Sequence, residues 1–242
     1  MDEQRYLNLL ERNKNKICWY SLCINPFAIS LINDILETNP SGINWSRLSG
    51  NPEAIHILEQ NPAKINWYML SFNQGAIHLL ETNQERINWD MLSYNPAAIQ
   101  LIETNLDKIN WKFLSTNPAA IHILESNFDK IDWYSLSRNP AAIHLLEANP
   151  DKIVWAQLLS NSAAMHLINK ALESNTGDDD ELCDDELWYY NDDEIWYWLS
   201  HNTSALDILE ENQDKICWDC FCANNHVYDY YMKSNNTKYI LK

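Results

Sequence analysis

Tryptophan recurs along this chain with a constant step of 22 residues. The step links six tryptophans in a row and reappears toward the C-terminal end, at Trp45, Trp67, Trp89, Trp111, Trp133 and Trp155 and then at Trp196 and Trp218. A fixed period of this length indicates tandem structural repeats, in which each short unit packs only on its neighbours. The chain is therefore predicted to fold as a repeat array, and together with Trp19 it holds nine tryptophan-containing units.

Each unit is predicted to contain one longer and one shorter helix. The longer helix follows an Asn-Pro pair such as Asn117-Pro118, since Asn caps helix N-termini and Pro fits the first helical position. Ten residues later, Asn127 is predicted to end that helix in the left-handed conformation. The shorter helix begins at the Trp, after an Asn or Asp cap such as Asp132, inside an Ile and Leu pair that matches a hydrophobic staple. Such short helices must stack to be stable, so the predicted fold class is an all-α solenoid of about nine 22-residue helix-turn-helix repeats.

Two longer steps divide the array. The 26 residues from Trp19 to Trp45 indicate a four-residue extension of the longer helix, which is close to one helical turn. The 41 residues from Trp155 to Trp196 equal one extended unit plus a 15-residue insertion. The predicted organisation is an N-terminal capping helix and first short helix over 1–24, regular repeats over 25–175, an acidic insert over 176–195, and C-terminal repeats with a cap over 196–242.

The tryptophan ladder is predicted to form the core of the array. A buried Trp removes about 150–250 Å² from water, and its position between the Ile and Leu of the staple favours burial over a ligand-stacking platform. On this interpretation Trp111→Ala would lower stability by about 3–5 kcal/mol.

The charge of the chain argues against nucleic acid as a partner. The formal net charge is −17, and ten acidic residues lie between Asp178 and Glu194. Such a field repels phosphates. The acidic insert is either a solvated loop, a docking segment or a calcium site, although it lacks the Gly of an EF-hand loop. Because Trp188, Tyr189 and Tyr190 are interleaved with its acids, a docking segment would suit a basic, partly apolar partner surface.

Location and chemistry are constrained by what the sequence lacks. It contains no run of 18 apolar residues and no secretory leader, which predicts a cytoplasmic protein with no membrane span and with mostly reduced cysteines. No nucleophile triad, phosphate loop or paired-carboxylate motif is recognisable. The expectation is a protein that is not an enzyme and has no catalytic residues and no cofactor.

Histidine also repeats, at one position of the longer helix. It occupies that position in five units, at His56, His78, His122, His144 and His166. One interpretation is a metal or proton ladder, and the other is a row of solvent-facing side chains. Adjacent helices lie about 8–10 Å apart, whereas zinc ligands sit about 2 Å from the metal. The spacing therefore favours the solvent-facing row.

A second metal-like pattern lies near the C-terminal end. Four residues of zinc-ligand type occur within ten positions, namely Cys217, Cys220, Cys222 and His226. Their spacing would suit a small structural zinc site. The alternative is that Cys217 and Cys222 simply fill the Asn and Ser positions of the repeat, as Cys18 and Cys23 do in the first unit. The second interpretation is favoured, so no metal site is predicted.

Positions that differ between units are the candidates for recognition. They follow the Trp or the Leu-Ser pair, and Tyr and Arg, which are favoured at interface hot spots, recur among them. The candidate partner-binding residues are Tyr68, Phe72, Tyr94, Lys112, Tyr134 and Arg138, together with Trp188, Tyr189 and Tyr190 of the insert. Some of them could instead fill gaps between units.

The repeated motif resembles a known group of sequences. Asn-Pro-Ala-Ala-Ile-His-x-Leu-Glu-x-Asn followed by Asp-Lys-Ile-Asn-Trp-x-x-Leu-Ser is similar to tandem repeats in uncharacterised proteins of giant DNA viruses that infect amoebae. The resemblance implies a viral protein of the host cytoplasm and brings no catalytic residues. The function expected from the sequence is a non-enzymatic protein-binding scaffold that engages a host or viral protein. The alternative is a helical repeat protein that binds RNA, as other helical repeats do, and the acidic charge disfavours it.

Overall fold

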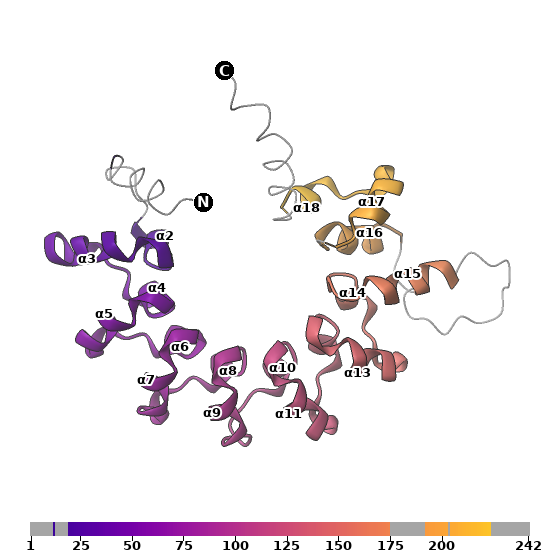
Figure 1. Ribbon diagram of the computed structural model, residues 1–242. Helices are drawn as coiled ribbons and strands as arrows, with labels where there is room; N and C mark the ends of the chain where they lie inside the picture. The colour runs from indigo at the N-terminus through magenta and orange to yellow at the C-terminus, as the bar shows by residue number, and fades with distance from the viewer. Residues whose placement is uncertain (1–11, 13–18, 175–191, 203, 224–242) are drawn as a thin grey trace. The chain divides into compact units, whose positions relative to one another are not determined.

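The chain folds into helices throughout the residues that its structure describes. The computed structural model covers residue 12 and residues 19–174, 192–202 and 204–223 (Figure 1). The chain separates into two compact parts, here called the N-terminal part (Met1–Ile123) and the C-terminal part (Leu124–Lys242), and each contains several of the 22-residue units. No strand occurs in the covered ranges, so the predicted all-α class and its repeated helix-turn-helix pattern are confirmed.

Two kinds of α-helix alternate, and short 3-10 helices connect them. The helices that carry the repeated tryptophan, here called Trp helices, are α2 (Trp19–Leu22), α4 (Trp45–Ser49), α6 (Trp67–Phe72), α8 (Trp89–Ser93), α10 (Trp111–Ser115), α12 (Trp133–Leu136), α14 (Trp155–Leu158), α16 (Asp192–His201) and α18 (Trp218–Ala223). The others are α3 (Ile29–Thr38), α5 (Ile55–Gln60), α7 (Ile77–Glu81), α9 (Ile99–Glu103), α11 (Ile121–Ser126), α13 (Ile143–Ala148), α15 (Met165–Ser174) and α17 (Leu206–Glu211). The 3-10 helices are η2 (Pro26–Ala28), η3 (Pro40–Gly42), η4 (Pro52–Ala54), η5 (Pro62–Lys64), η6 (Gln74–Ala76), η7 (Gln84–Arg86), η8 (Pro96–Ala98), η9 (Pro118–Ala120), η10 (Phe128–Lys130), η11 (Pro140–Ala142), η12 (Pro150–Lys152) and η14 (Gln213–Lys215).

The longer helix of a regular unit is two elements, not the single helix of ten residues expected from the sequence. Asn95 caps the 3-10 helix η8 by accepting a hydrogen bond from the Ala97 N–H, so the Asn-Pro cap is confirmed. The 3-10 turn closes with the Ala98 N–H on the Asn95 carbonyl at 3.1 Å, and only then does α9 begin. Ala98 itself lies outside the α region, at φ −92° and ψ 11°, which separates the two elements. The predicted four-residue extensions are present, since α3 and α15 have ten residues each.

The asparagine that ends the longer helix does not adopt the predicted left-handed conformation. Asn127 has φ −135°, and Asn61 has φ −130°. The reason is the 3-10 helix that follows, for which this residue serves as the preceding extended residue. The Asn61 side-chain amide instead donates to the Ile57 carbonyl at 2.9 Å, which satisfies a carbonyl at the helix end.

The start of the Trp helix follows the prediction in α4, α6, α8, α10 and α12, which have an Asn or Asp cap. It does not in α14, which follows Val154 without a side-chain cap, or in α16, which begins at Asp192, before Trp196. Asn88 accepts a hydrogen bond from the Met91 N–H at 2.9 Å, and Asp132 caps α12 in the same way. Ile87 and Leu92, the two residues of the expected staple, are both buried. The sequence pattern thus places the capped helices correctly to the residue.

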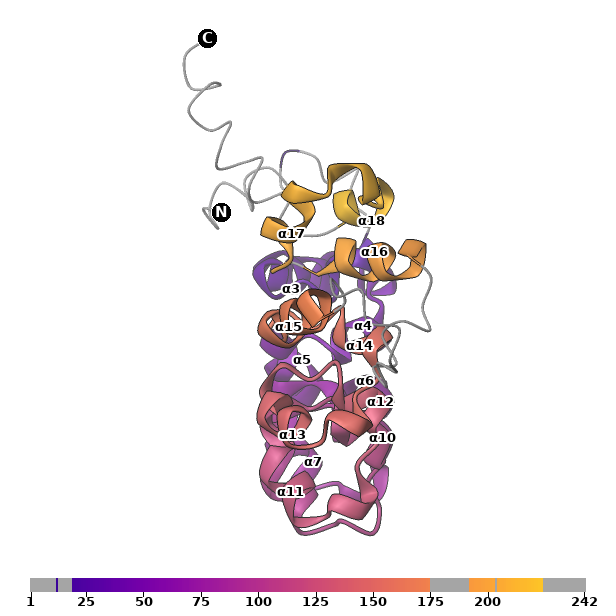
Figure 2. The same ribbon diagram turned by 90° about the vertical axis from the view of Figure 1, so that its right-hand side faces the viewer.

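The helices stack in two rows inside each compact part. In Met1–Ile123, the helices α4, α6, α8 and α10 contact one another in sequence, as do η4, η6, η8 and η9 (Figure 1). Viewed at right angles, α4 and α6 again lie on one side of this part and α3, α5 and α7 on the other (Figure 2). In Leu124–Lys242, α14 contacts α16 and α16 contacts α18. The 41-residue step therefore inserts chain between two stacked neighbours without interrupting the row.

The core consists of leucine rows, and the prediction of a buried tryptophan ladder is wrong. The leucine three residues after Trp is fully buried in seven units, at Leu48, Leu70, Leu92, Leu114, Leu136, Leu158 and Leu199, each 0 % exposed. Of the nine repeated tryptophans, only Trp155 and Trp196 are buried, and Trp218 is 56 % exposed. The others are half-buried.

A basic residue from the next unit explains the half-buried tryptophans. The Lys108 ammonium lies 4.9 Å from the Trp89 ring centroid, and the Arg86 guanidinium lies 5.2 Å from that of Trp67. Lys215 makes a similar contact with Trp196, at 5.0 Å, although that Trp is buried. The conserved spacing of Trp therefore reflects a cation-π contact at the rim as much as burial.

We expect Lys108→Met to lower the free energy of unfolding by about 0.5–1 kcal/mol. It keeps an apolar stem over Trp89 but removes the charge, and with it the hydrogen bond that Lys108 Nζ donates to Asn105 Oδ1 at 2.8 Å. Urea unfolding followed by circular dichroism measures the change. Lys170→Met, at an exposed position of α15, serves as the control and should leave the midpoint unchanged. Equal shifts in the two variants would show that the contact with Trp89 contributes nothing specific.

Buried asparagines join successive units through side-chain hydrogen bonds. The Asn73 amide donates to the Ser49 carbonyl at 2.9 Å and the Asn51 carbonyl at 3.0 Å, both in the preceding unit. Its oxygen accepts from the Gly75 N–H. The same position is buried in seven units, at Asn51, Asn73, Asn95, Asn117, Asn139, Asn161 and Asn202. Asn202 reaches the Leu159 and Asn161 carbonyls at 2.8 and 3.2 Å, so this asparagine ladder continues across the 41-residue step.

A second ladder uses the serine that follows the core leucine in most units, although Leu158 is followed by Leu159. The Ser71 hydroxyl donates to the Trp67 carbonyl at 2.7 Å and accepts the Asn88 backbone N–H of the next unit at 2.9 Å. In the first unit Cys23 takes this place, and its sulfur accepts the Asn44 N–H at 3.3 Å. Burial raises the pKa of Cys23, so the sulfur stays a neutral thiol in its structural position.

Candidate partner-binding surface

The residue after Trp points away from the core in most repeat units, and buried Ala156 after Trp155 is an exception. It precedes the core leucine by two positions, which is about 200° around a helix. Tyr20 on α2, Tyr68 on α6 and Tyr134 on α12 occupy this position and are 53 %, 54 % and 51 % exposed. Exposed large aromatics at this position, in Met1–Ile123 and separately in Leu124–Lys242, make this face of the Trp helices the candidate site of each part, and it is here called the short-helix surface.

In the N-terminal part, Met1–Ile123, the short-helix surface combines aromatic and basic side chains. Phe72, at the end of α6, is 44 % exposed and extends the patch that Tyr68 begins. The Arg47 guanidinium lies 4.1 Å from the Tyr20 ring centroid. Lys112 on α10 is exposed as well. Tyr68, Phe72 and Lys112 are thus accessible, as a recognition role requires.

Tyr94 differs from the other predicted residues of this group. Its ring is half-buried and stacks on Phe113 of the next Trp helix, with centroids 4.5 Å apart and an interplanar angle of 24°. Tyr94 therefore fills the gap between α8 and α10, which was the alternative open for such positions. The two residues are 19 positions apart, and only the stacking of the units brings them together.

In the C-terminal part, Leu124–Lys242, the same surface carries some residues that were predicted from the sequence and others that were not. Tyr134 and Arg138 are exposed, as expected. Tyr197 on α16 is 44 % exposed and Trp218 on α18 is 56 % exposed, and neither was predicted. Tyr197 follows a repeated Trp, so its position in the unit was a usable signal. The remaining predicted residues, Trp188, Tyr189 and Tyr190, lie outside the described residues, as does most of the acidic insert, although α16 already begins at Asp192.

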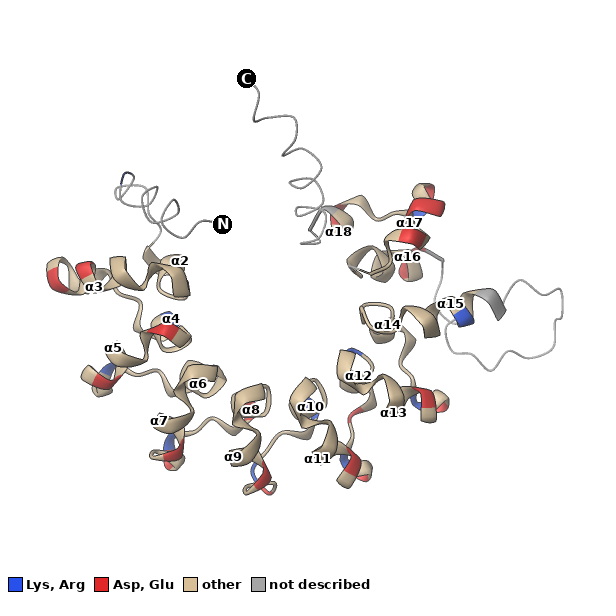
Figure 3. Cartoon of the chain, viewed as in Figure 1, with Lys and Arg blue, Asp and Glu red and all other residues tan. Residues whose placement is uncertain are grey.

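Charge is distributed unevenly between the two rows. In the N-terminal part, the described Trp helices carry only three charged residues, Arg47, Asp90 and Lys112. Acidic residues gather instead on the other row, at α5, α7 and α9 (Figure 3). The short-helix surface of Met1–Ile123 therefore carries exposed aromatic side chains and is close to neutral, in contrast to the net charge of −17 for the whole chain.

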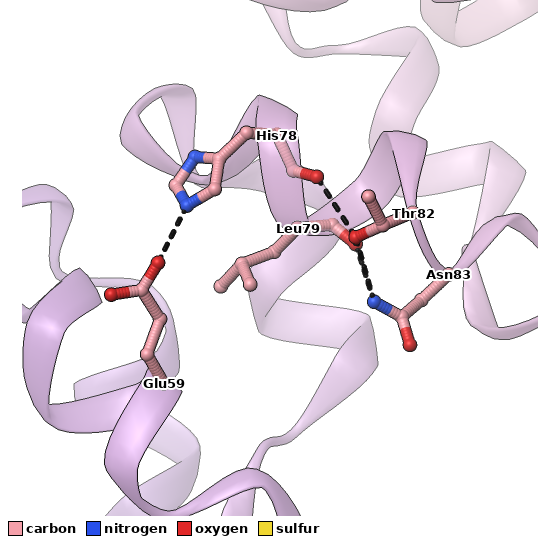
Figure 4. Close-up of polar contacts among 5 residues, drawn as sticks. All are labelled: Glu59, His78, Leu79, Thr82 and Asn83. Atoms are coloured by element: carbon pink, nitrogen blue, oxygen red, sulfur yellow. Dashed lines mark hydrogen bonds and ion pairs between the residues drawn. The ribbon is translucent and has the colours of Figure 1, made fainter.

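Four of the five repeated histidines, all except His56, pair with a glutamate of the preceding unit. His78 Nε2 lies 2.8 Å from Glu59 Oε1, while the backbone carbonyls of His78 and Leu79 accept bonds from Thr82 and Asn83 (Figure 4). The same pair recurs three times, as His122–Glu103, His144–Glu125 and His166–Glu147. Each imidazole thus faces a carboxylate of the preceding unit, which agrees with the solvent-facing interpretation. Both partners are about half exposed, so each pair contributes little to stability.

The cysteine pattern near the C-terminal end is described only in part. The Cys217 thiol donates to the Cys220 sulfur at 2.8 Å. The side chain of Cys222 and all of His226 lie outside the described residues. Among the side chains that are described, no three of His, Cys, Asp and Glu come together as a metal site would require. The four-ligand zinc site stays an open alternative.

A groove lies beside the extended helix α3 in the N-terminal part. The groove has a volume of about 550 Å³ and is lined by residues of α3, η3, α4, α5 and η5, among them Leu36, Glu37, Pro40, Trp45 and Lys64. It lies where the 22-residue step is first broken.

Comparison with known proteins adds no relative. A scan against protein-family models, a search of curated proteins and a search of solved structures each found no match to this chain. In the described ranges no helix has the length and apolar character needed to cross a membrane.

Proposed function

We propose that this chain is a non-enzymatic scaffold that binds a protein through its short-helix surface. The supporting observation is the contrast between buried and exposed positions within one unit. Leucine, asparagine and serine repeat at the buried positions, whereas the exposed position after Trp holds Tyr68, Asp90, Lys112 and Tyr134 in successive units. A rigid repeated frame that displays varying, aromatic-rich side chains is suited to protein recognition.

The composition of this surface favours protein over RNA. An RNA-binding array needs basic residues that neutralise phosphates and recur from unit to unit. In the N-terminal part, the described Trp helices contribute only Arg47 and Lys112 as basic residues, and Arg47 lies over Tyr20. Exposed Tyr and Phe side chains instead supply the apolar anchors of a protein interface.

The partner and its location follow from the resemblance of the repeats. Repeats similar to those of amoeba-infecting giant viruses would place the chain in the cytoplasm of an infected host. The partner would then be a host or viral protein. We propose that the acidic insert contacts a basic, partly apolar surface on that partner. The short-helix surface of the N-terminal part is close to neutral and does not call for a basic partner surface.

The double variant Tyr68→Ser/Phe72→Ser is expected to lose the partner while the fold is kept, because both side chains are exposed and belong to no ladder. Wild type and variant are compared by affinity capture from infected and uninfected amoebae. The identified partner is then titrated against each purified protein. Loss of two aromatic anchors should weaken binding by about 10–100-fold.

A matched control lies on the opposite row of the N-terminal part. Glu59→Gln/His78→Gln removes an exposed pair of similar size and should leave the affinity unchanged. Equal weakening by the control would contradict binding through the short-helix surface. Capture of RNA that falls steeply with salt concentration would favour the alternative function instead.

A further inference from the structure

Two cysteines meet at the start of the last described Trp helix. Cys217 directly precedes α18 and Cys220 lies in its first turn, and the two sulfurs are 2.8 Å apart. Cys220 is 7 % exposed, and Cys217 is more accessible. A disulfide has an S–S length of about 2.05 Å, so a shift of less than about 1 Å would bring these atoms to bonding distance.

Neither thiol has a role in the ladders that hold the units together. The contrast is Cys23, whose sulfur replaces a serine hydroxyl and accepts the Asn44 N–H. At Cys217 the backbone N–H makes the inter-unit bond, to the Ser200 hydroxyl at 3.0 Å. Cys220 occupies the position that holds Met91 and Phe113 in other units, where side-chain packing is all that is required.

We propose that Cys217 and Cys220 form a reversible thiol–disulfide site, with a small-molecule disulfide such as oxidised glutathione as the oxidant. The Cys217 thiolate attacks one glutathione sulfur, forms a mixed disulfide and releases the other glutathione as a thiolate. The Cys220 thiolate then attacks the Cys217 sulfur and displaces the second glutathione. The two protein protons end on the two glutathiones, so two protein thiols and one glutathione disulfide give one protein disulfide and two reduced glutathiones.

The order of attack follows from the surroundings of the two thiols. Burial, followed by the hydrogen bond from Cys217, raises the pKa of Cys220 to about 11. Cys220 is thus the poorer first nucleophile and is also the less accessible one. Cys217 meets the oxidant first, and Cys220 resolves the mixed disulfide from contact distance.

The site adjoins the proposed binding surface. Trp218 lies between the two cysteines in sequence and is 56 % exposed. Closing the disulfide would fix the first turn of α18 and with it the backbone that carries this side chain. The redox site itself is independent of whether the short-helix surface binds a protein.

The test uses the full-length chain in glutathione buffers of graded oxidised-to-reduced ratio. After alkylation of free thiols, peptide mass mapping follows Cys217 and Cys220. The expected result is loss of two hydrogens from the peptide that links them, reversed by excess reduced glutathione. Cys220→Ser should abolish this loss and retain glutathione on Cys217, whereas Cys23→Ser and Cys222→Ser should oxidise as the wild type does.

Three outcomes would overturn the proposal. The first is a disulfide that joins Cys217 to a cysteine other than Cys220. The second is a pair that stays reduced at ratios that oxidise the same chain in urea. The third is stoichiometric zinc on the reduced protein that blocks oxidation, which would assign the pair to a metal site.

Discussion

Replacing Asn95 with Asp is expected to lower the free energy of unfolding by about 3–5 kcal/mol. Asn95 is 0 % exposed, and its amide donates to the Ser71 and Asn73 carbonyls at 3.1 and 3.2 Å. A carboxylate has nearly the same shape but donates no hydrogen bond. It would place a buried charge against two carbonyl oxygens and remove the link between two units.

The cap made by Asn95 separates this effect from ordinary helix capping. Its side-chain oxygen accepts the Ala97 N–H at 3.0 Å, and an Asp carboxylate would keep that bond. Asn and Asp are comparable as N-caps. Any loss in Asn95→Asp therefore reports the inter-unit bonds and the buried charge, and not the cap.

Urea unfolding followed by circular dichroism measures this loss, with Asn33→Asp as the control. Asn33 is exposed on α3, so its replacement should change the free energy by less than about 0.5 kcal/mol. A lower pH that protonates the buried Asp should restore part of the stability. If Asn95→Asp unfolds at the wild-type midpoint, the asparagine ladder does not hold the units together.

The fold could be predicted from the sequence because its main determinants are local. The 22-residue step gives the unit length, and each cap bonds only two or three residues ahead, as Asn95 and Asn88 do. The division into a 3-10 turn and an α-helix was not predicted. It depends on Ala98 lying outside the α region, which the Asn-Pro-Ala-Ala pattern does not reveal.

The contacts between units could not be predicted, because they depend on how far one unit is offset from the next. The asparagine ladder joins residues 22 and 24 apart, the serine ladder joins residues 17 apart, and the His78–Glu59 pair spans 19. A repeating sequence offers every such pairing at once. Only stacking selects among them, which is why the partner of Tyr94 was missed.

The candidate site was partly predictable for a related reason. The exposure of Tyr68 and Tyr134 follows from helix geometry, since the residue after Trp must point away from the core leucine. The role of Trp itself was misjudged because a constant residue at a constant step can mark burial or a contact at the rim. Lys108 over Trp89 decides for the rim.

The leucine rows lead to the second large expected effect. Leu92→Ala should lower the free energy of unfolding by about 3–4 kcal/mol, because it empties a fully buried position. Leu92 is 0 % exposed on α8, which contacts α6 on one side and α10 on the other. The cavity therefore opens where three Trp helices meet, and no neighbour can collapse into it without separating the units.

Comparison with Trp89→Ala makes this expectation decisive. A Trp at the heart of the core would cost about 3–5 kcal/mol on truncation, whereas half-buried Trp89 should cost about 2 kcal/mol from lost area and the Lys108 contact. Leu206→Ala is the control, since Leu206 is 39 % exposed and should cost less than about 1 kcal/mol. A clearly larger loss in Trp89→Ala than in Leu92→Ala would return the tryptophan ladder to the centre of the core, because only full burial of the indole would then account for the order.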